Sequence, residues 1–512
     1  MNDVILARSQ SLSTIFRRGA ERNGDRVAII CGDVVWTYTA LDELADALAR
    51  GLRGQGVAKG DRVAVLARNS HGFVALRIAV ARLGAVLVPV NFMLTPDEAN
   101  YILDHSGARL LFVDASTIDL GHAARPSSVE NIFGLPGEHA PAPETIPSWD
   151  TLCLDGDAVE EQVNGADLLQ IIYTSGTESR PKGAMLTHDA VLWQYQSCIV
   201  GCEWQREAVV LHALPLFHCA QLDAILGPAL QVGAINIITA TPTPENLIPL
   251  LATHRISAFF APPTVWISLL RSSLFDQHDL SHLRQGYYGA SIMPVEVLHE
   301  LRRRLPQLRL WNLYGQTEIA PVATILLPHE QETHAGSAGR AALHVSTRVV
   351  DEAMEDVAVG DIGEIVHRSP QLMQGYWNDA ERTAAAFKGG WFHSGDLATI
   401  DADGYITVVD RMKDMIKTGG ENVSSREVEE AIYSHPGVAE VAVIGLADDR
   451  WIEIVAAVIV PRADTKLSEA DLIAHCRGRL GSFKVPKRIV FAEALPRNAS
   501  GKILKRELRD LA

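Results

Sequence analysis

The alternation of short apolar runs with amphipathic stretches constrains the fold of this chain more than any other feature. A turn at Gly60 leads into the apolar run 63–66, the helical stretch 73–83 follows, and a second apolar run covers 85–90. Similar apolar runs recur at 209–216, 234–238 and 256–262. Strands that alternate with helices in this way predict an α/β fold, in which layers of helices cover a largely parallel sheet.

The length of the chain, 512 residues, exceeds what one hydrophobic core supports, so two or more domains are expected. The pattern changes near 396–414, where a hairpin-type turn at 401–405 separates short strands. The remaining residues predict a small α+β unit of their own, with helices at 426–435 and 469–480 and strands at 438–444 and 454–460. We therefore predict a large N-terminal domain of layered α/β subdomains, residues 1–410, and a small C-terminal domain, residues 415–512.

Composition excludes several classes of function. The net charge of −16 argues against general nucleic-acid binding, which requires a basic face. The six cysteines form no CxxC pair, as is typical of reduced thiols in a cytosolic protein. The N-terminal residues do not resemble a signal peptide, and the apolar runs are too short to span a bilayer. We expect a cytoplasmic protein without an integral membrane segment; association into homo-oligomers stays open.

The segment 171–183, IIYTSGTESRPKG, joins an apolar strand to a loop rich in small hydroxyl residues, glycine and one lysine. Such a loop can direct backbone N–H groups and hydroxyls at phosphate oxygens, while Lys182 adds positive charge. It is not the common GxxxxGK[ST] loop, because Gly183 follows the lysine. Taken alone, the string is equally typical of a solvent-exposed Ser/Thr/Gly turn.

This string resembles the phosphate loop of the adenylate-forming superfamily, which includes acyl-CoA synthetases, adenylation domains of peptide synthetases and luciferases. The usual form is Tyr-Thr-Ser-Gly-Thr-Thr-Gly-x-Pro-Lys-Gly, so Glu178 replaces a Thr and Ser179 replaces a Gly. A carboxylate beside phosphates is electrostatically unfavourable, and we expect Glu178 to point outward or to pair with Arg180. The resemblance implies that ATP is bound here by Thr174, Ser175, Gly176, Thr177 and Lys182.

The segment 311–318, WNLYGQTE, resembles the Tyr-Gly-x-Thr-Glu segment of the same family. The resemblance implies that Tyr314 covers the adenine, Thr317 holds the α-phosphate and Glu318 ligates Mg²⁺, for which a carboxylate is a suitable hard ligand. Without the family, Tyr314 would belong to a strand-end turn and Glu318 would be an acid at a helix N-terminus. Further implied contacts are those of Asn312 and Gly315 with ATP and of Thr177 with the metal.

The segment 391–396, WFHSGD, resembles the family's Thr-Gly-Asp element with Ser in place of Thr. The resemblance implies that Asp396 accepts hydrogen bonds from the ribose hydroxyls, a role that suits an ionised carboxylate. It further implies that Arg411 donates to the ribose and that Lys413, within 411–414, is the hinge of a mobile C-terminal domain. Otherwise Asp396 would cap a turn and Arg411 would be a surface charge.

Two C-terminal segments complete the resemblance. The segment 417–423, KTGGENV, resembles the glycine turn that approaches the pantetheine of coenzyme A, which implies CoA contacts at Lys417, Gly419 and Gly420. The segment 496–504, PRNASGKIL, resembles the loop with the family's catalytic lysine. Lys502 would then neutralise charge between the substrate carboxylate and the α-phosphate. Without the family, these segments would be a turn and an exposed basic tail.

Two segments resemble the family's acyl site. His218 matches an aromatic or histidine position that borders the acyl group, although a lone histidine among apolar residues is often a packed core residue. The segment 287–294 resembles the small-residue strand that floors the pocket; otherwise it is a buried strand end. The acyl pocket predicted on this basis comprises His218, Gln221, Tyr288, Gly289, Leu313 and Ile319. Gly289, Ala290 and Ser291 are also predicted to contact ATP.

The reaction that the resemblance implies has two steps: a carboxylate displaces pyrophosphate from Mg·ATP, and the acyl group then passes from AMP to coenzyme A. The bulk of Leu313 and the lack of a well-placed cation for a second carboxylate favour a monocarboxylic acid, either a medium- or long-chain fatty acid or an aryl acid. One alternative is an amide ligase with an amine acceptor. Another is a nucleotide-binding regulator without catalysis, given Glu178 and Ser179.

Replacing Lys502 with alanine is expected to slow adenylate formation by on the order of a hundredfold or more, because one charge-stabilising contact in the transition state is lost. ATP–pyrophosphate exchange with a turned-over acid measures this step. Exchange at the rate of the unaltered protein would refute the scheme.

Overall fold

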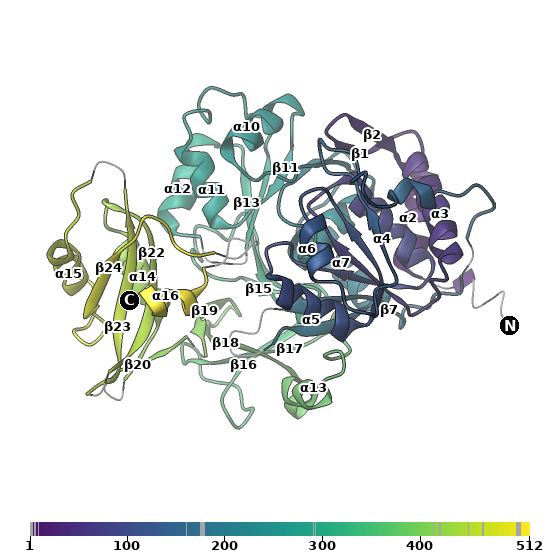
Figure 1. Ribbon diagram of the computed structural model, residues 1–512. Coiled ribbons are helices and arrows are strands. Elements are labelled where there is room, and N and C mark those ends of the chain that lie inside the picture. Colours follow the sequence, from purple (N-terminus) through teal and green to yellow (C-terminus); the bar gives the residue numbers. More distant parts are fainter. Residues whose placement is uncertain are drawn as a thin grey trace.

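The computed structural model describes residues 4, 7–8, 10–159, 161–174, 180–289, 291, 293–412, 414–418, 421–448, 450–462, 465–497 and 503–511. The fold class is the predicted one: a large N-terminal domain of mixed α/β layers and a small C-terminal domain lie side by side (Figure 1).

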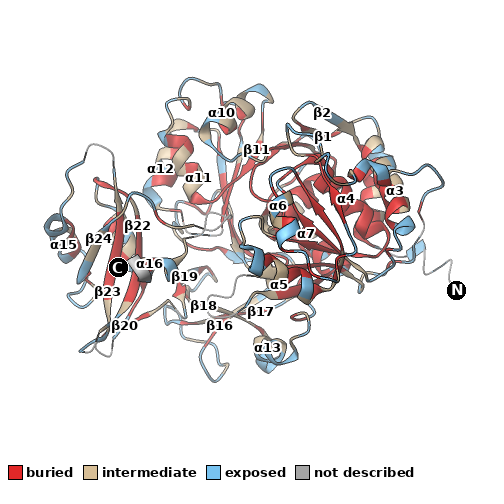
Figure 2. Ribbon diagram, viewed as in Figure 1, coloured by how far each residue is buried: buried red, intermediate tan, exposed pale blue. Residues whose placement is uncertain are grey.

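One layer of the N-terminal domain is a six-stranded sheet of order β6-β5-β3-β4-β7-β8, in which only the β7–β8 pair is antiparallel. Its strands are β3 (Arg62–Leu66), β4 (Val86–Pro89), β5 (Ala108–Val113), β6 (Asn131–Gly134), β7 (Leu168–Thr174) and β8 (Lys182–Thr187). The helices of this layer are α4 (His71–Arg82), α5 (Pro96–Ser106) and α6 (Ile118–Ala123). Continuous apolar runs are typical of parallel strands covered on both faces, and the strands and α4 are largely buried in Figure 2.

A nine-stranded sheet of order β15-β14-β13-β12-β11-β9-β10-β1-β2 forms the second layer, and its six strands from β13 to β1 are parallel. Its strands are β1 (Val27–Cys31), β2 (Val34–Thr37), β9 (Val209–His212), β10 (Ile235–Ile238), β11 (Ala258–Phe260), β12 (Gln285–Gly289), β13 (Arg309–Gly315), β14 (Val322–Leu326) and β15 (Arg340–Ala341).

Helices cover both faces of this second sheet. One face packs on α10 (Pro244–Thr253), α11 (Pro263–Arg271) and α12 (Val295–Arg304). The other packs on α7 (His188–Gly201) and on a helix formed by α8 (Cys219–Gln221), the π-helical turn η2 (Leu222–Leu226) and α9 (Gly227–Val232). Helices α2 (Leu12–Asn23), α3 (Tyr38–Gly54) and α4 share one core with strands of both sheets. The two sheets are thereby joined into one body.

Two antiparallel sheets complete the chain. The first, of order β16-β17-β18-β19, consists of β16 (Ser346–Val350), β17 (Gly363–Arg368), β18 (Phe392–Ile400) and β19 (Ile406–Arg411), with α13 (Ala380–Ala386) beside it. The C-terminal domain has β20 (Ile416–Thr418), β21 (Glu421–Val423), β22 (Val438–Asp448), β23 (Ile452–Pro461) and β24 (Arg488–Phe491). Its helices are α14 (Ser425–Tyr433), α15 (Glu469–Arg477) and α16 (Lys505–Leu511), and β22, β23 and α14 enclose its own core.

The predicted elements are present, and their ends differ where a local rule intervenes. The helix predicted at 39–53 is α3, in which the Ala40 N–H donates to the Thr37 side chain as an N-cap. The strand predicted at 256–262 is shorter, because Pro262 and Pro263 lack the N–H that a ladder needs and Pro263 instead begins α11. The strand predicted at 209–216 ends at His212.

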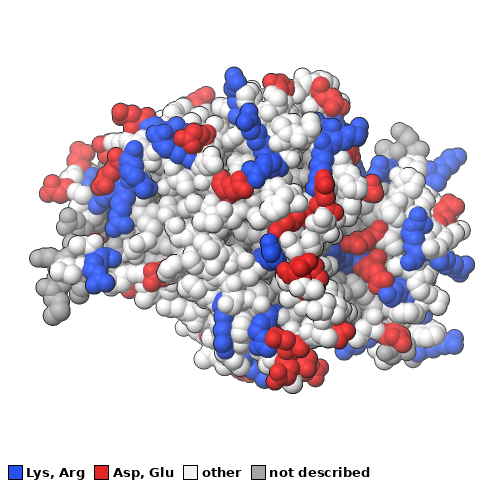
Figure 3. All heavy atoms as spheres, turned by 180° about the vertical axis from the view of Figure 1, so that it is seen from behind, with Lys and Arg blue, Asp and Glu red and all other residues white. Residues whose placement is uncertain are grey.

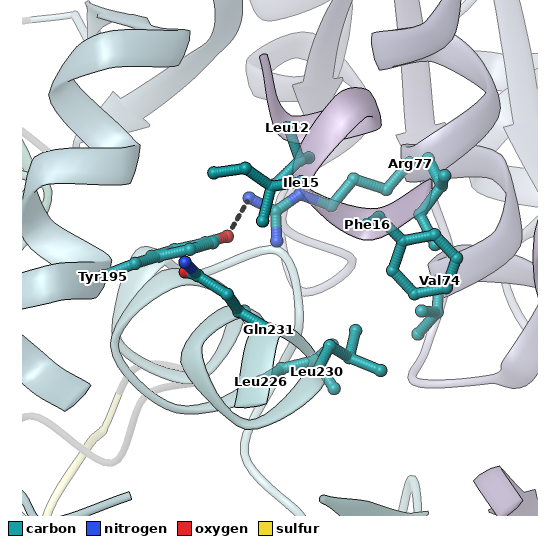
Figure 4. A pocket seen from close by; sticks show the side chains of 11 residues that line it. Leu12, Ile15, Phe16, Val74, Arg77, Tyr195, Leu226, Leu230 and Gln231 are labelled. Atoms are coloured by element: carbon teal, nitrogen blue, oxygen red, sulfur yellow. Dashed lines mark hydrogen bonds between the residues drawn. The ribbon is translucent and has the colours of Figure 1, made fainter. Parts of the chain in front are cut away.

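A buried ion pair connects the layers of the N-terminal domain. Arg77 of α4 contacts the Asp223 carboxylate of η2, and Gln170 Nε2 of β7 donates to Asp223 Oδ2 at 2.6 Å. Arg77 Nη2 also donates to the Tyr195 hydroxyl of α7 at 3.1 Å, as the dashed line in Figure 4 shows. A small apolar pocket lies beside this group, lined by Leu12, Ile15, Phe16, Val74, Leu226 and Leu230 among others (Figure 4).

The surface carries both signs of charge. On the face seen in Figure 3, acidic and basic side chains are interspersed, and neither sign forms a continuous stripe. None of the described helices is both long enough and apolar enough to cross a membrane.

Acid is expected to destabilise the fold through three buried histidines, His188, His212 and His367. Burial lowers their pKa from 6.5 to about 3, 4 and 4 respectively, so the folded protein holds each ring neutral. As the pH falls below 6.5, the unfolded chain binds protons that the folded chain does not, and stability is lost between pH 6.5 and about 4. Each ring should contribute a loss of roughly 1–2 kcal/mol by about pH 5.

Urea unfolding as a function of pH measures this loss. His188→Gln should flatten the pH dependence, whereas His139→Gln should not, because the His139 side chain is 72% exposed. Equal pH dependence in both variants would contradict the assignment to buried rings.

Candidate functional site

The candidate site lies at the carboxyl end of β13, an edge at which parallel sheets commonly bind ligands. The backbone passes very close to its neighbours here. Gly315 has φ of 155°, and a Cβ atom on it would lie 1.9 Å from the Pro321 carbonyl oxygen. A Cβ atom on Gly289, at the end of β12, would lie 2.4 Å from the Leu313 carbonyl oxygen. Only glycine fits at these two positions without moving the backbone.

A carboxylate held by two donors forms one end of the site. The Tyr314 hydroxyl donates to Asp396 Oδ2 at 2.8 Å, and Gln316 Nε2 donates to the same oxygen at 3.1 Å. Arg411 is paired with Asp396 across β18 and β19, with its Nε 3.4 Å from Oδ1. Burial, reinforced by the Asp396 charge, raises the pKa of Tyr314 well above its usual range, so the phenol remains a donor. The structure thus brings three predicted residues, Tyr314, Asp396 and Arg411, together.

Thr317 contacts the segment that contains His218. The Thr317 hydroxyl lies 3.2 Å from Cys219 Sγ, and His218 Nδ1 accepts from the Ala220 N–H at 3.2 Å at the start of α8. Burial raises the pKa of the Cys219 thiol far above its usual range, which keeps the sulfur protonated. Cys219 was not among the residues predicted for the site, and its position directly after His218 was the only signal for it in the sequence.

Glu318 is oriented by a second phenol. The Tyr376 hydroxyl donates to Glu318 Oε1 at 2.9 Å, and the Lys182 ammonium lies 4.6 Å from the centre of the Tyr376 ring. Burial first, and then the Glu318 charge, raise the pKa of Tyr376 above its usual range, so this phenol also stays protonated. Sequence analysis missed Tyr376, because nothing distinguishes it in the sequence from an aromatic residue of the core.

Backbone pairing fixes this arrangement. Thr174 and Lys182 are paired across β7 and β8. The Trp377 N–H donates to the Gly183 carbonyl at 2.7 Å, so the segment with Tyr376 runs alongside β8. The Met373 N–H donates to the Glu318 carbonyl at 2.8 Å. Lys182, Tyr376 and Glu318 therefore come from three segments that are tied together through main-chain bonds.

The residues predicted for the acyl pocket divide between the two faces of the nine-stranded sheet. Leu313 and Ile319 are buried in one cluster with Trp311. Tyr288 is packed on the opposite face with α10–α12, and its hydroxyl donates to Gln331 Oε1 at 2.8 Å. Successive strand residues alternate in direction, so the structure does not bring Tyr288 together with Leu313. Gln221 is wholly buried, and its Nε2 lies 2.7 Å from His212 Nδ1.

The remaining predicted residues are placed as follows. Asn312 Nδ2 donates to the Ser337 carbonyl at 2.8 Å, and Ser291 is exposed. The Lys417 N–H of β20 donates to Glu453 Oε2 at 2.7 Å. Eight predicted residues lie outside the described part of the chain: Ser175, Gly176, Thr177, Ala290, Lys413, Gly419, Gly420 and Lys502.

A magnesium ion would fit Glu318, because Mg²⁺ is usually bound through one or two carboxylates together with substrate phosphates and water. Among the described residues, no group of three or more His, Cys, Asp or Glu could hold a metal by itself. The donor set around Glu318 therefore suits an ion that arrives with a phosphate-bearing substrate.

Comparison with known proteins identifies the family. The family model described as AMP-binding enzyme matches residues 16–377, and that of the AMP-binding enzyme C-terminal domain matches residues 427–502. The chain belongs to the AMP-binding enzyme family.

Proteins similar to this AMP-binding enzyme include CoA synthases and CoA ligases. A feruloyl-CoA synthase of an Amycolatopsis species is 36% identical over 98% of this chain and 99% of its own length. The long-chain-fatty-acid–CoA ligase FadD13 of Mycobacterium tuberculosis is 35% identical over 93% of both chains. The crystal structure of the anthranilate CoA ligase AuaEII with anthranoyl-AMP superposes with a TM-score of 0.90 at 26% identity, covering 98% of this chain and 97% of that one. The chain is an AMP-forming acid–thiol ligase that uses ATP and coenzyme A.

Replacing Tyr376 with phenylalanine should lower kcat/KM for ATP by about tenfold or more, because a hydrogen bond to a charged group contributes about 1.5–3 kcal/mol. Initial rates at varied ATP and Mg²⁺ measure the effect. Tyr405 offers a matched control, since its hydroxyl donates to Glu330 Oε1 at 2.8 Å away from the site. Tyr405→Phe should leave the ATP dependence as it was, and an equal fall in both variants would contradict the role assigned to Tyr376.

Proposed function

We propose that the enzyme activates a monocarboxylic acid as an acyl-adenylate and then transfers the acyl group to the thiol of coenzyme A. The observation that carries this proposal is the continuity of the site along residues 316–318. Gln316 bonds the Asp396 carboxylate, Thr317 follows it, and Glu318 is joined through Tyr376 to Lys182. A nucleotide laid along this line would have its ribose at Asp396 and its phosphates at Thr317 and Lys182.

Each group has a role that its chemistry supports. Tyr314 would cover the adenine, while Asp396 accepts from the ribose hydroxyls and Arg411 donates to the ribose. Thr317 would donate to the α-phosphate, and Lys182 would offset the charge of the phosphates. Further ATP contacts are proposed for Thr174, Ser175, Gly176, Thr177, Gly289, Ala290, Ser291, Asn312 and Gly315. Mg²⁺, held by Glu318 and Thr177, would offset charge on the phosphate oxygens during displacement.

The substrate carboxylate needs no base, because it is ionised at neutral pH. Its oxygen attacks the α-phosphorus in line, the bond to the pyrophosphate oxygen breaks, and pyrophosphate leaves. Lys502 is proposed to stabilise the charge that develops between the two reacting groups. In the second step the thiolate of coenzyme A attacks the acyl carbon and AMP leaves.

The two steps are proposed to use different positions of the C-terminal domain, residues 415–512, which pivots about Lys413 within 411–414 relative to residues 1–410. Next to the hinge, Ser424 and Ser425 donate to the Val409 carbonyl and the Asp410 carboxylate at 2.7–2.8 Å. Farther from the hinge, two longer hydrogen bonds link the two parts. Arg426 Nη2 donates to the Gly336 carbonyl at 3.1 Å, and Arg271 Nη2 donates to the Ala439 carbonyl at 3.3 Å. A contact of this kind is compatible with relative domain motion. Rotation would bring Lys417, Gly419 and Gly420 towards the site with coenzyme A.

The acid is proposed to be an aryl acid or a medium- to long-chain fatty acid. The relatives named for feruloyl-CoA, long-chain fatty acids and anthranilate support this range. The acyl group is proposed to lie against Leu313 and Ile319, which belong to one apolar cluster, with His218 and Gln221 contributed by the start of α8. The buried cation near this helix, Arg77, is paired with Asp223 and so does not favour a second carboxylate on the substrate.

A coupled AMP-release assay over a panel of acids tests the proposal. Cinnamates, benzoates or fatty acids should be converted in a CoA-dependent reaction, and malonate and methylmalonate should react on the order of a hundredfold more slowly, because a second charge would be buried without a partner. Parallel reactions with amines in place of coenzyme A separate thioester from amide formation. Faster conversion of a dicarboxylate than of the monocarboxylic acids would refute the proposal. The absence of ATP–pyrophosphate exchange with every acid of the panel would also refute it.

A further inference from the structure

A line of three buried polar side chains, Asn236, His212 and Gln221, ends in an acceptor that none of the described residues satisfies. His212 Nε2 lies 2.9 Å from Asn236 Oδ1, and Gln221 Nε2 lies 2.7 Å from His212 Nδ1. All three residues are wholly buried. The amide oxygen of Gln221, Oε1, is buried and receives no hydrogen bond from the described part of the chain.

The backbone dictates how each member of this line is oriented. Asn236 Nδ2 donates to two carbonyl groups, those of Ala28 at 2.9 Å and Ala234 at 3.0 Å. Its Oδ1 must therefore face His212, so His212 Nε2 must carry the proton. Burial lowers the pKa of His212 to about 4, so the ring is neutral and Nδ1 is an acceptor. Gln221 consequently directs its NH₂ group at His212 and its oxygen away from it.

The oxygen lies on the face of the sheet that would contact the acyl group. Val210 packs in one cluster with Leu313 and Ile319, and His212, two residues further along β9, points to the same side. Gln221 reaches His212 from the helix above this face. Cys219, two residues before Gln221, contacts the Thr317 hydroxyl at 3.2 Å. The acceptor thus lies on the same face of the sheet as Leu313 and Ile319, on the short helix whose first residue contacts Thr317.

We propose that Gln221 Oε1 recognises a neutral hydrogen-bond donor on the acid, so that the enzyme prefers acids whose apolar body carries a hydroxyl or N–H group. This inference rests on the proposed function and names the substrate class within it. A buried acceptor without a donor costs about 1–3 kcal/mol, and a substrate group that supplies the donor removes this cost. A site built in this way rejects the analogue that lacks the donor. The donor is neutral, because the amide oxygen would not offset the burial of an ammonium group.

Within this scheme Gln221 is a specificity-determining residue, and His212 and Asn236 are positioning residues. Their effect passes through the orientation of the Gln221 amide. An ether or a hydrogen atom in place of the donor would leave the oxygen unpaired, whereas a phenol hydroxyl, an indole N–H or an aniline N–H would satisfy it.

The test compares matched acids in CoA-dependent AMP release. The series is cinnamate and benzoate, their 2-, 3- and 4-hydroxy derivatives, and the corresponding methyl ethers. At least one hydroxy acid should exceed both its parent and its ether in kcat/KM by on the order of tenfold or more. Gln221→Met keeps the length of the side chain and removes the acceptor. In this variant the ratio of kcat/KM for the hydroxy acid to kcat/KM for its parent or ether should fall towards one.

Gln371→Met is the matched control. Gln371 is equally buried, but both of its amide atoms have partners, since Oε1 accepts from Ser197 at 2.5 Å and Nε2 donates to the Val322 carbonyl at 2.9 Å. It should lower the melting temperature and leave the hydroxyl preference in place.

Two results would overturn the inference: no hydroxy acid surpassing both its parent and its ether, or an unaltered ratio in Gln221→Met. In either case conversion of the parent acids would still support the proposed function, whereas failure to convert any acid would count against that function itself.

Discussion

The contact between Arg77 and Asp223 is the interaction on which the arrangement of the site depends. It joins a helix of the six-stranded layer to the π-helical turn that packs against the nine-stranded layer, and Gln170 and Tyr195 complete its hydrogen bonds. A buried pair of this kind adds little net stability, since desolvation offsets much of the attraction. Removing one partner, however, leaves an uncompensated charge. The pair therefore fixes where the helix lies, and with it His218, Cys219 and Gln221.

Each of two carboxylates in the site accepts a hydrogen bond from a tyrosine. Asp396 is held by the phenol of Tyr314, and Glu318 by the phenol of Tyr376. Burial keeps both phenols protonated, so each remains a hydrogen-bond donor to its carboxylate. Anionic groups that are already ordered lose less conformational freedom when a ligand is bound.

The sequence predicted the layered fold, and its short motifs predicted several residues that the structure brings together, because both depend on local patterns. Helix α3 could be located from its apolar spacing, and Tyr314, Asp396 and Arg411 from short motifs. Tyr376 and Cys219 could not, since their roles arise from contacts between segments distant in the chain. The family resemblance also assigned Tyr288 and Leu313 to one pocket, whereas they lie on opposite faces of the sheet. The end of β11 was misplaced because prolines, rather than hydrophobicity, decide it.

The burial of Cys219 has a consequence for the chemistry of the intermediate. An acyl-adenylate is an acylating agent, and a thiolate 3.2 Å from Thr317 would be a nucleophile within reach of it. Burial raises the pKa of this thiol and keeps it protonated, so in the proposed reaction it would not compete with the sulfur of coenzyme A. In the proposed reaction, a sulfur atom close to the activated carbonyl would therefore not be acylated.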